Sequence, residues 1–232
     1  MDILGAIVQA AILISGGVIT VATALVVEQA RRPKLQLVMT SHTDAQFNNR
    51  LASSARWVHL KLGNLPPSGW TRWVPRQTAT QCRGTVTFYY LNGQSVFKED
   101  MPVRWAGSPQ PIPSEVRDPT GQLTGLIYNL SQLSLESWMD VPPGEGQTLD
   151  IAGRFDNDVD CYGWSNESYF SNPLWRNPGR KLPPGEYLVR VTVVCAGEKC
   201  ADVFRLINEG PVANFRLEVA KKDDRKKLAS PR

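Results

Sequence analysis

The sequence predicts an all-β protein, an antiparallel β-sandwich preceded by one N-terminal transmembrane α-helix. Uncharged residues run without interruption from Ile3 to Val27, and after Pro33 short segments alternate between apolar and polar side chains. Turns rich in Pro and Gly separate these segments. A period of two is typical of strands with one buried face, and many short strands joined by turns favour a sandwich.

The first predicted element is a membrane-spanning helix within residues 1–30. The uncharged run holds 25 residues, and a helix of that length crosses the roughly 30 Å hydrocarbon layer with some tilt. A cleaved signal peptide is the alternative, but it has basic residues before a shorter apolar run. Only Met1 and Asp2 precede this run, which favours an uncleaved span.

The charges beside the span predict its orientation. Arg31, Arg32 and Lys34 follow it and no Lys or Arg precedes it. Flanks rich in Lys and Arg stay in the cytoplasm, so we expect a single-pass protein of the cell membrane with a cytoplasmic C-terminal domain. A small-residue ridge in the helix allows a homo-oligomer; it consists of Gly16, Thr20 and Ala24.

The strands of the sandwich are expected between residues 34 and 219. Period-two alternation occurs at 56–62, 82–90, 149–155, 187–195 and 215–219. Residues 107–121, rich in Pro, are expected to form a surface loop. The stretch 122–139 is less clear, because Leu126, Leu130 and Leu133 suit one short helix.

A repeated turn adds detail to this fold. Pro-Pro-Gly-Glu occurs at 142–145 and at 183–186, where Gly suits the positive φ of a type II turn. The second copy is followed by Tyr187, and this arrangement resembles the start of strand F in immunoglobulin-like domains, where a Tyr bonds back to the chain. Val189 stands where antibody domains have Cys. The fold expected is therefore an immunoglobulin-like sandwich without the antibody disulfide.

The net charge of +4 is confined to one end of the chain. Residues 220–232 carry six Lys or Arg and two Asp, and the rest of the chain is neutral. Such a tail is expected to be disordered and to attract an anionic bilayer surface. The neutral body offers no basic patch, so no nucleic-acid partner is expected.

One acidic segment has the spacing of a calcium loop. Counted from Asp156, carboxylates fall at positions 1, 3, 5 and 12, which are Asp156, Asp158, Asp160 and Glu167. These are side-chain ligand positions of an EF-hand loop. Position 6 is Cys161 instead of Gly, and the flanks are not helical, so a solvated acidic loop is the simpler interpretation. Calcium is the one cofactor that the sequence suggests.

The four cysteines are interpreted as structural. Cys82, Cys161, Cys195 and Cys200 are expected to be buried free thiols in the reducing cytoplasm. In an oxidising compartment, Cys195 is expected to pair with Cys200 across a hairpin loop, and Cys82 with Cys161. A zinc site would require further ligands near these residues.

The seven Trp residues allow three interpretations. They fill the core, they form a stacking platform for a carbohydrate, or, in one loop, they contact the membrane. That loop combines aromatic and basic residues close to the predicted span; its candidate contact residues are Trp70, Arg72, Trp73 and Arg76.

No motif of an enzyme family is present. The sequence lacks GxGxxG, a P-loop, HExxH and GxSxG. With two His, a Ser-His or Cys-His site has no support from a motif. We therefore expect a protein that is not an enzyme.

Several stretches are similar to an uncharacterised prokaryotic family of single-span membrane proteins with an immunoglobulin-like body. They are 78–84, 101–105, 161–169 and 175–178, together with the turn before Tyr187. The resemblance implies the fold and the membrane anchor, and it implies no activity.

The leading functional hypothesis is a membrane-anchored interaction or scaffold module with an unidentified protein partner. The alternative is an exported module that binds a carbohydrate or another ligand, through the Trp-rich face or the acidic loop, with calcium as a possible cofactor. Free thiols favour the first and bridged cysteines the second.

Overall fold

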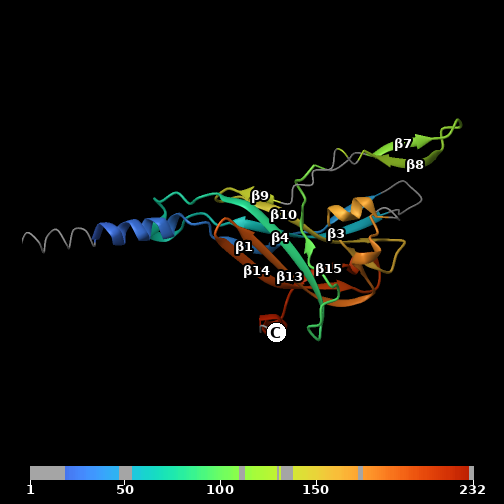
Figure 1. The fold of residues 1–232 in the computed structure, drawn as a ribbon. Coiled ribbons are helices and arrows are strands. Elements are labelled where there is room, and N and C mark those ends of the chain that lie inside the picture. The colour runs from blue at the N-terminus through green and yellow to red at the C-terminus, as the bar shows by residue number, and fades with distance from the viewer. Residues whose placement is uncertain are drawn as a thin grey trace, which may run out of the picture.

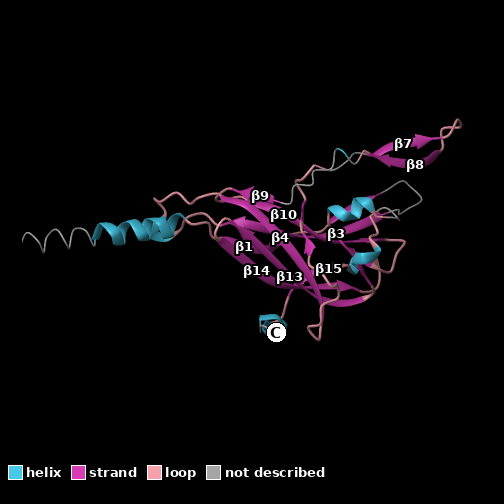
Figure 2. Ribbon diagram, viewed as in Figure 1, coloured by secondary structure: helices cyan, strands magenta, loops and turns pink. Residues whose placement is uncertain are grey.

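Two antiparallel sheets pack face to face, which confirms the all-β sandwich (Figures 1 and 2). The computed structural model describes residues 19–46, 54–109, 113–129, 131, 138–171 and 175–229. Short 3₁₀ turns lie between the strands; they are η1 (Gly69–Thr71), η3 (Asn166–Phe170), η4 (Pro178–Arg180) and η5 (Val212–Asn214).

The first sheet has the order β1-β3-β10-β11-β12, with β2 beside β3 and β6 beside β10. Alternation along β3 sends Val58, Leu60 and Leu62 into the core and places Trp57 and His59 on the outer face. The strands are β1 (Leu35–Met39), β2 (Thr43–Gln46), β3 (Ser54–Asn64), β6 (Arg104–Trp105), β10 (Gly146–Phe155), β11 (Cys161–Gly163) and β12 (Lys181–Leu182).

The second sheet has the order β15-β14-β13-β4-β5, with β9 beside β4. Its central strand, β13, pairs along its length with both β14 and β4. All five strands expected from the alternation are present in the two sheets. The strands of this sheet are β4 (Ala79–Tyr90), β5 (Met101–Pro102), β9 (Trp138–Val141), β13 (Gly185–Cys195), β14 (Glu198–Asn208) and β15 (Arg216–Val219).

The core lies between the sheets and draws on both. Leu60 and Ile151 from the first sheet and Phe88 and Val191 from the second are completely buried. Burial of each such side chain stabilises the fold by about 1.5–3 kcal/mol. The turn at 142–145 closes as expected, with Gly144 at a φ of +80°.

Residues expected to form a loop instead form a hairpin, β7 (Pro113–Arg117) and β8 (Leu123–Tyr128). The two strands pair only with each other, and Figure 1 shows them standing away from the sandwich. The loop prediction was right at 107–109 and at the tip, where Asp118 accepts hydrogen bonds from the N–H groups of Thr120 and Gln122. A short helix at 122–139 was also wrong over 123–128; residues 130 and 132–137 lie outside the described residues.

An α-helix, α1, spans residues 19–31 and leaves the sandwich at the end opposite the hairpin (Figure 1). Its apolar side chains are largely exposed, with 65% of Ile19 and 66% of Leu25 open to solvent. Residues 3–18 of the predicted span lie outside the described residues. Within the described part of the chain, no helix has both the length and the apolar character needed to cross a bilayer.

The basic tail is not disordered over its described part. Residues Lys222–Ala229 form helix α2, which packs on the outer face of the second sheet. Asp224 is buried and forms a 2.6 Å ion pair with Arg205 of β14, while Leu228 packs beside Leu188 and Val203. The composition of the tail predicted disorder, but Leu228 and Asp224 are placed where they meet partners on the sheet. Residues 230–232 lie outside the described residues.

Candidate functional site

The end of the sandwich next to α1 is organised around one buried side chain, Asn64. Its side-chain oxygen accepts a hydrogen bond from the Lys34 N–H (3.1 Å), and its amide donates to the carbonyls of Gln77 (2.9 Å) and Val141 (3.1 Å). The Gln77 N–H in turn donates to the Arg31 carbonyl at the end of α1 (2.7 Å). Asn64 therefore ties the helix exit and the loop 65–78 to the core.

The predicted membrane-contact loop is placed beside that helix exit. Trp73 is 70% exposed, Arg72 is exposed and Arg76 is half-buried. For Trp70, only the backbone is described, within η1. The loop thus presents an aromatic and a basic side chain at the end of the body from which α1 departs.

Most of the other Trp residues pack against the body of the protein. Trp105 is in the core, and Trp57, Trp164 and Trp175 pack with Phe155 on the outer face of the first sheet. Each of these three rings is in contact with another aromatic ring, edge-on or stacked. Trp138, at 38% exposed, stands apart on the second sheet.

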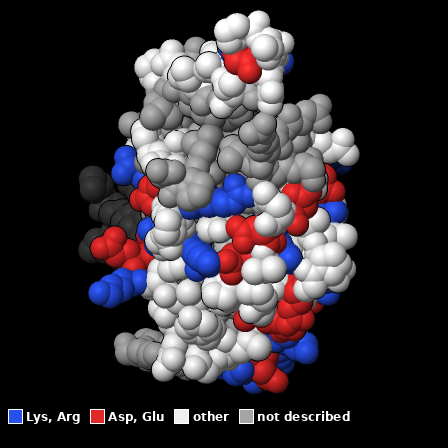
Figure 3. Space-filling view, turned by 90° about the vertical axis from the view of Figure 1, so that its right-hand side faces the viewer, with Lys and Arg blue, Asp and Glu red and all other residues white. Residues whose placement is uncertain are grey.

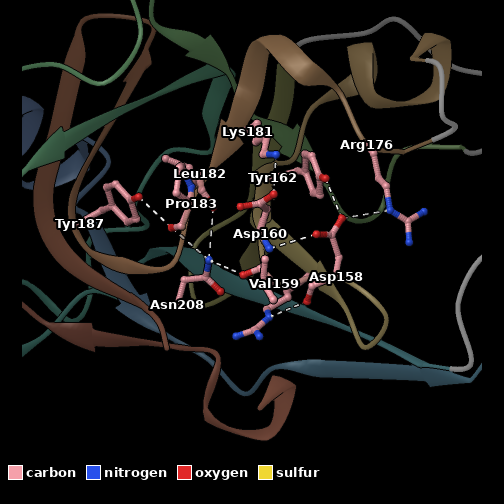
Figure 4. A network of polar contacts seen from close by, with 11 residues as sticks. Asp158, Val159, Asp160, Tyr162, Arg176, Lys181, Leu182, Pro183, Tyr187 and Asn208 are labelled. Atoms are coloured by element: carbon pink, nitrogen blue, oxygen red, sulfur yellow. Dashed lines mark hydrogen bonds and ion pairs between the residues drawn. The ribbon is translucent and has the colours of Figure 1, made fainter. Parts of the chain in front are cut away.

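The acidic segment forms separate ion pairs and hydrogen bonds, as Figure 4 shows for Asp158 and Asp160. Asp158 accepts a 2.7 Å hydrogen bond from the Tyr162 hydroxyl and faces Arg176 at 3.4 Å. Asp160 pairs with Lys181 at 2.5 Å. The two remaining carboxylates lie elsewhere: Asp156 accepts from the Ser54 N–H (3.0 Å) and Glu167 faces Arg180 (3.7 Å).

These contacts set the charge state of the segment. Burial raises the pKa of Asp158, but hydrogen bonds from Tyr162 and the Asp160 N–H and the charge of Arg176 outweigh it, so the net pKa lies below its ordinary value. Burial, together with the hydrogen bond to the same carboxylate, raises the pKa of Tyr162. The hydrogen bond with Asp160 raises the pKa of Lys181.

The four carboxylates of the possible calcium loop do not gather around one point. Across the described residues, no group of three or more His, Cys, Asp or Glu side chains gathers where a metal ion would fit. The reason is the backbone: the segment leaves strand β10 and returns as β11 instead of coiling around a centre. The carboxylates therefore diverge toward different basic partners.

The far end of the sandwich shows the consequence of this pairing. Figure 3 shows Lys and Arg interleaved with Asp and Glu on that face, without a broad patch of a single sign among the described residues. Ion pairs between the Asp158–Glu167 segment and Arg176, Arg180 and Lys181 belong to this end. Such a surface is mixed in charge.

The cysteine prediction was wrong in its pairing. Cys82 and Cys195 form a disulfide between the neighbouring strands β4 and β13, and both are buried. Cys161 and Cys200 remain free. The predicted pairs, Cys195 with Cys200 and Cys82 with Cys161, do not form, because Cys195 faces the core beside strand β4, which carries Cys82. Burial raises the pKa of the Cys161 thiol well above its ordinary value, so this thiol is unreactive.

Tyr187 takes the role expected of it. Its hydroxyl donates a 2.8 Å hydrogen bond to the Pro183 carbonyl, closing the corner before β13. Asn208, completely buried, donates from its side chain to the carbonyls of Leu182, Pro183 and Val159 (Figure 4). The two side chains together fix the connection between the sheets at this corner.

One constellation escaped the sequence analysis. On the outer face of the first sheet, His59 Nδ1 lies 2.8 Å from Asp150 Oδ1, and His59 Nε2 lies 2.9 Å from Thr43 Oγ1. Arg104 Nε lies 3.8 Å from the other oxygen of Asp150. His59 and Asp150 were assigned to strands from the alternation, but the pairing of β3 with β10 that joins them has no local signal.

No protein-family model, curated protein or solved structure matches this chain. The class of protein is therefore defined by the fold alone, an antiparallel β-sandwich with an N-terminal helix and a projecting hairpin. The similarity to an uncharacterised single-span family stays a prediction.

Proposed function

We propose that this chain is a membrane-anchored β-sandwich that acts as an interaction or scaffold module for a protein partner. The observation that carries the proposal is that helix α1 and the β7–β8 hairpin lie at opposite ends of the molecule (Figure 1). Helix α1 leaves one end of the sandwich, and the β7–β8 hairpin stands off the other. An anchor at one end and a free arm at the other suit a module that holds a partner away from a bilayer.

The proposal of an anchor rests mainly on the uncharged run in the sequence. Residues 3–27 are uncharged, and the described helix continues that run with Ile19, Val21 and Leu25 at least 60% exposed. Apolar side chains on all sides of a helix need a protein or lipid environment. Trp73 and Arg72 beside the helix exit suit the headgroup level, where Trp and Arg are enriched.

The hairpin is the interaction surface that we propose. A two-stranded hairpin is only marginally stable alone in water, and this one carries exposed Val116 (38%) and Ile127 (62%). Both of its outer edges are unpaired in the described residues. A partner that adds a strand or covers the apolar side chains would stabilise it.

The finer fold that we propose is immunoglobulin-like. The bond from Tyr187 to the Pro183 carbonyl is the feature that supports it. The disulfide departs from the antibody pattern, because it joins neighbouring strands of one sheet instead of the two sheets.

Affinity purification of the tagged full-length protein tests the module directly. A stoichiometric partner is expected with the wild-type chain and with Val219→Asp, a control at an exposed body residue. The double variant Val116→Asp, Ile127→Asp is expected to lose that partner. Retention of the partner by the double variant would assign binding to the body instead.

The side of the membrane has two candidates, each with its own support. Arg31, Arg32 and Lys34 favour a cytoplasmic body. The Cys82–Cys195 bridge favours export, since disulfides persist in oxidising compartments. Quenching of intact cells in acid, followed by alkylation of the denatured protein without reductant, distinguishes them: four free thiols support the cytoplasmic body, and two support the exported one.

A further inference from the structure

Three side chains on neighbouring strands form a continuous hydrogen-bonded row. His59 on β3 pairs directly with Asp150 on β10, and Thr43 on β2 pairs with Trp57, two residues from His59 and on the same face. The contacts run from Thr43 Oγ1 to His59 Nε2 (2.9 Å) and from His59 Nδ1 to Asp150 Oδ1 (2.8 Å). A hydroxyl, an imidazole and a carboxylate in this order are the arrangement of an activated nucleophile.

The chemistry of these three groups determines which atoms donate and which accept the hydrogen bonds. A carboxylate accepts only, so Asp150 requires a proton on His59 Nδ1. The neutral imidazole then has its lone pair on Nε2, which accepts the Thr43 hydroxyl proton. This is the tautomer that a general base needs, with the base held by a third group.

The row is also held rigidly. His59 and Asp150 are 8% and 7% exposed, and Arg104, 2% exposed, lies against the second oxygen of Asp150. Arg104 is itself fixed by Asn166 (2.6 Å) and by the Ser108 carbonyl (3.0 Å). Thr43, by contrast, is exposed. A buried, fixed base beneath an exposed hydroxyl is preorganised for attack on a molecule that arrives from solvent.

We propose that Thr43 is the nucleophile of an acyl-transfer site that hydrolyses carboxylic esters, with His59 as general base and Asp150 as the positioning residue. Thr43 Oγ1 attacks the ester carbonyl as His59 Nε2 takes its proton. The bond to the alcohol breaks, and the alcohol leaves with that proton. Water then attacks the acyl-threonine, with His59 again as base, releasing the carboxylic acid and restoring the Thr43 hydroxyl.

The surroundings indicate the kind of ester. Trp57 lies directly opposite Thr43 in the β2–β3 pair, and its side chain is only half-buried. An acyl group on Thr43 would therefore lie on the sheet face that carries this indole ring, which favours an apolar acyl chain.

A fluorophosphonate probe on the full-length protein in detergent tests this site. An activated hydroxyl attacks phosphorus, a bond from oxygen to phosphorus forms, and fluoride leaves. We expect the adduct on Thr43, located by peptide mass spectrometry, and hydrolysis of p-nitrophenyl butyrate by the same protein. Thr43→Ser keeps both signals, and Thr43→Val, which keeps the shape of the side chain, abolishes them.

Two further variants separate catalysis from packing. Asp150→Asn is expected to slow labelling by about 100-fold or more, the scale of general-base catalysis. Thr87→Val removes a hydroxyl on strand β4 of the second sheet that donates to Asp100 (2.6 Å), and it is expected to leave labelling unchanged. The proposal fails if wild type and Thr43→Val label alike, or if folded Asp150→Asn, checked by circular dichroism, labels at the wild-type rate.

Discussion

The side-chain amide of Asn64 donates a 2.9 Å hydrogen bond to the carbonyl of Gln77, across the base of the loop that carries Trp73. Asn64 is 1% exposed. Because the Gln77 N–H also holds the Arg31 carbonyl, this contact couples the exit of α1 to the loop beside it. The Asn64 amide thus adds to the backbone hydrogen bond from the Leu65 N–H to the Lys34 carbonyl (2.9 Å) in placing the loop relative to α1.

Replacement of Asn64 by Ala is expected to loosen this end. It leaves the Lys34 N–H and the Gln77 and Val141 carbonyls without their partner, at a cost of about 1–3 kcal/mol for each group that stays buried and unpaired. We expect a lower thermal midpoint and faster proteolysis within 65–78. Asn92→Ala, at an exposed turn, is the control and should change neither.

Reduction of the Cys82–Cys195 bridge is expected to destabilise the sandwich. The bridge spans a sequence separation of 113 residues, and loss of a native disulfide typically costs about 2–5 kcal/mol. Urea unfolding with and without reductant measures the difference. Cys200→Ser, which leaves the bridge in place, should unfold like the wild type, and an equal midpoint with and without reductant would contradict the pairing.

Acid is expected to release helix α2. Burial raises the pKa of Asp224, but the hydrogen bond and charge of Arg205 and the charge of Lys227 outweigh it, and the net pKa is lowered. A carboxylate whose folded pKa lies below the unfolded value, about 3.9, stabilises the fold above that pH and loses its contribution as the pH falls through the folded pKa.

Hydrogen exchange at 222–229, compared between pH 7 and pH 3 after correction for intrinsic rates, should therefore show faster opening in acid. Asp224→Asn should open at both pH values. Protection that is unchanged at pH 3 would mean that Leu228 and its neighbours, not the Arg205 ion pair, hold the helix.

Calcium is expected to leave the protein unchanged. Asp158 and Asp160 already have basic partners in Arg176 and Lys181, and a cation would have to displace them. We expect the same thermal midpoint with millimolar calcium and with chelator. A rise with calcium that disappears in Asp158→Asn would restore the metal site that the spacing suggested.

The sequence predicts the positions of strands from the alternation of side chains, but it does not predict which strands pair. Val58, Leu60 and Leu62 were placed on the core face because the strand period is local. The strands that pair with one another could not be predicted, because pairing depends on contacts between residues far apart in sequence, such as His59 and Asp150. The disulfide partner of Cys82 was missed for the same reason.

Spacing also misled at the acidic segment, since ligand positions count only when the backbone coils around them. Asp158 occupies a calcium-ligand position in the sequence spacing, but in the structure it faces Arg176. Turn residues were reliable for local geometry: Tyr187 and Gly144 adopt the expected roles. The prediction of a loop at 107–121 was right in part, because the tip of a hairpin has the same composition as a loop.

The central claim is that residues 3–27 anchor this sandwich in a bilayer. Extraction of cell membranes with alkaline carbonate tests it most directly, because this treatment removes peripheral proteins and leaves spanning ones. The full-length chain is expected in the membrane pellet, and a variant that lacks residues 2–30 is expected in the supernatant. Release of the full-length chain by carbonate would contradict the anchor proposed for the molecule.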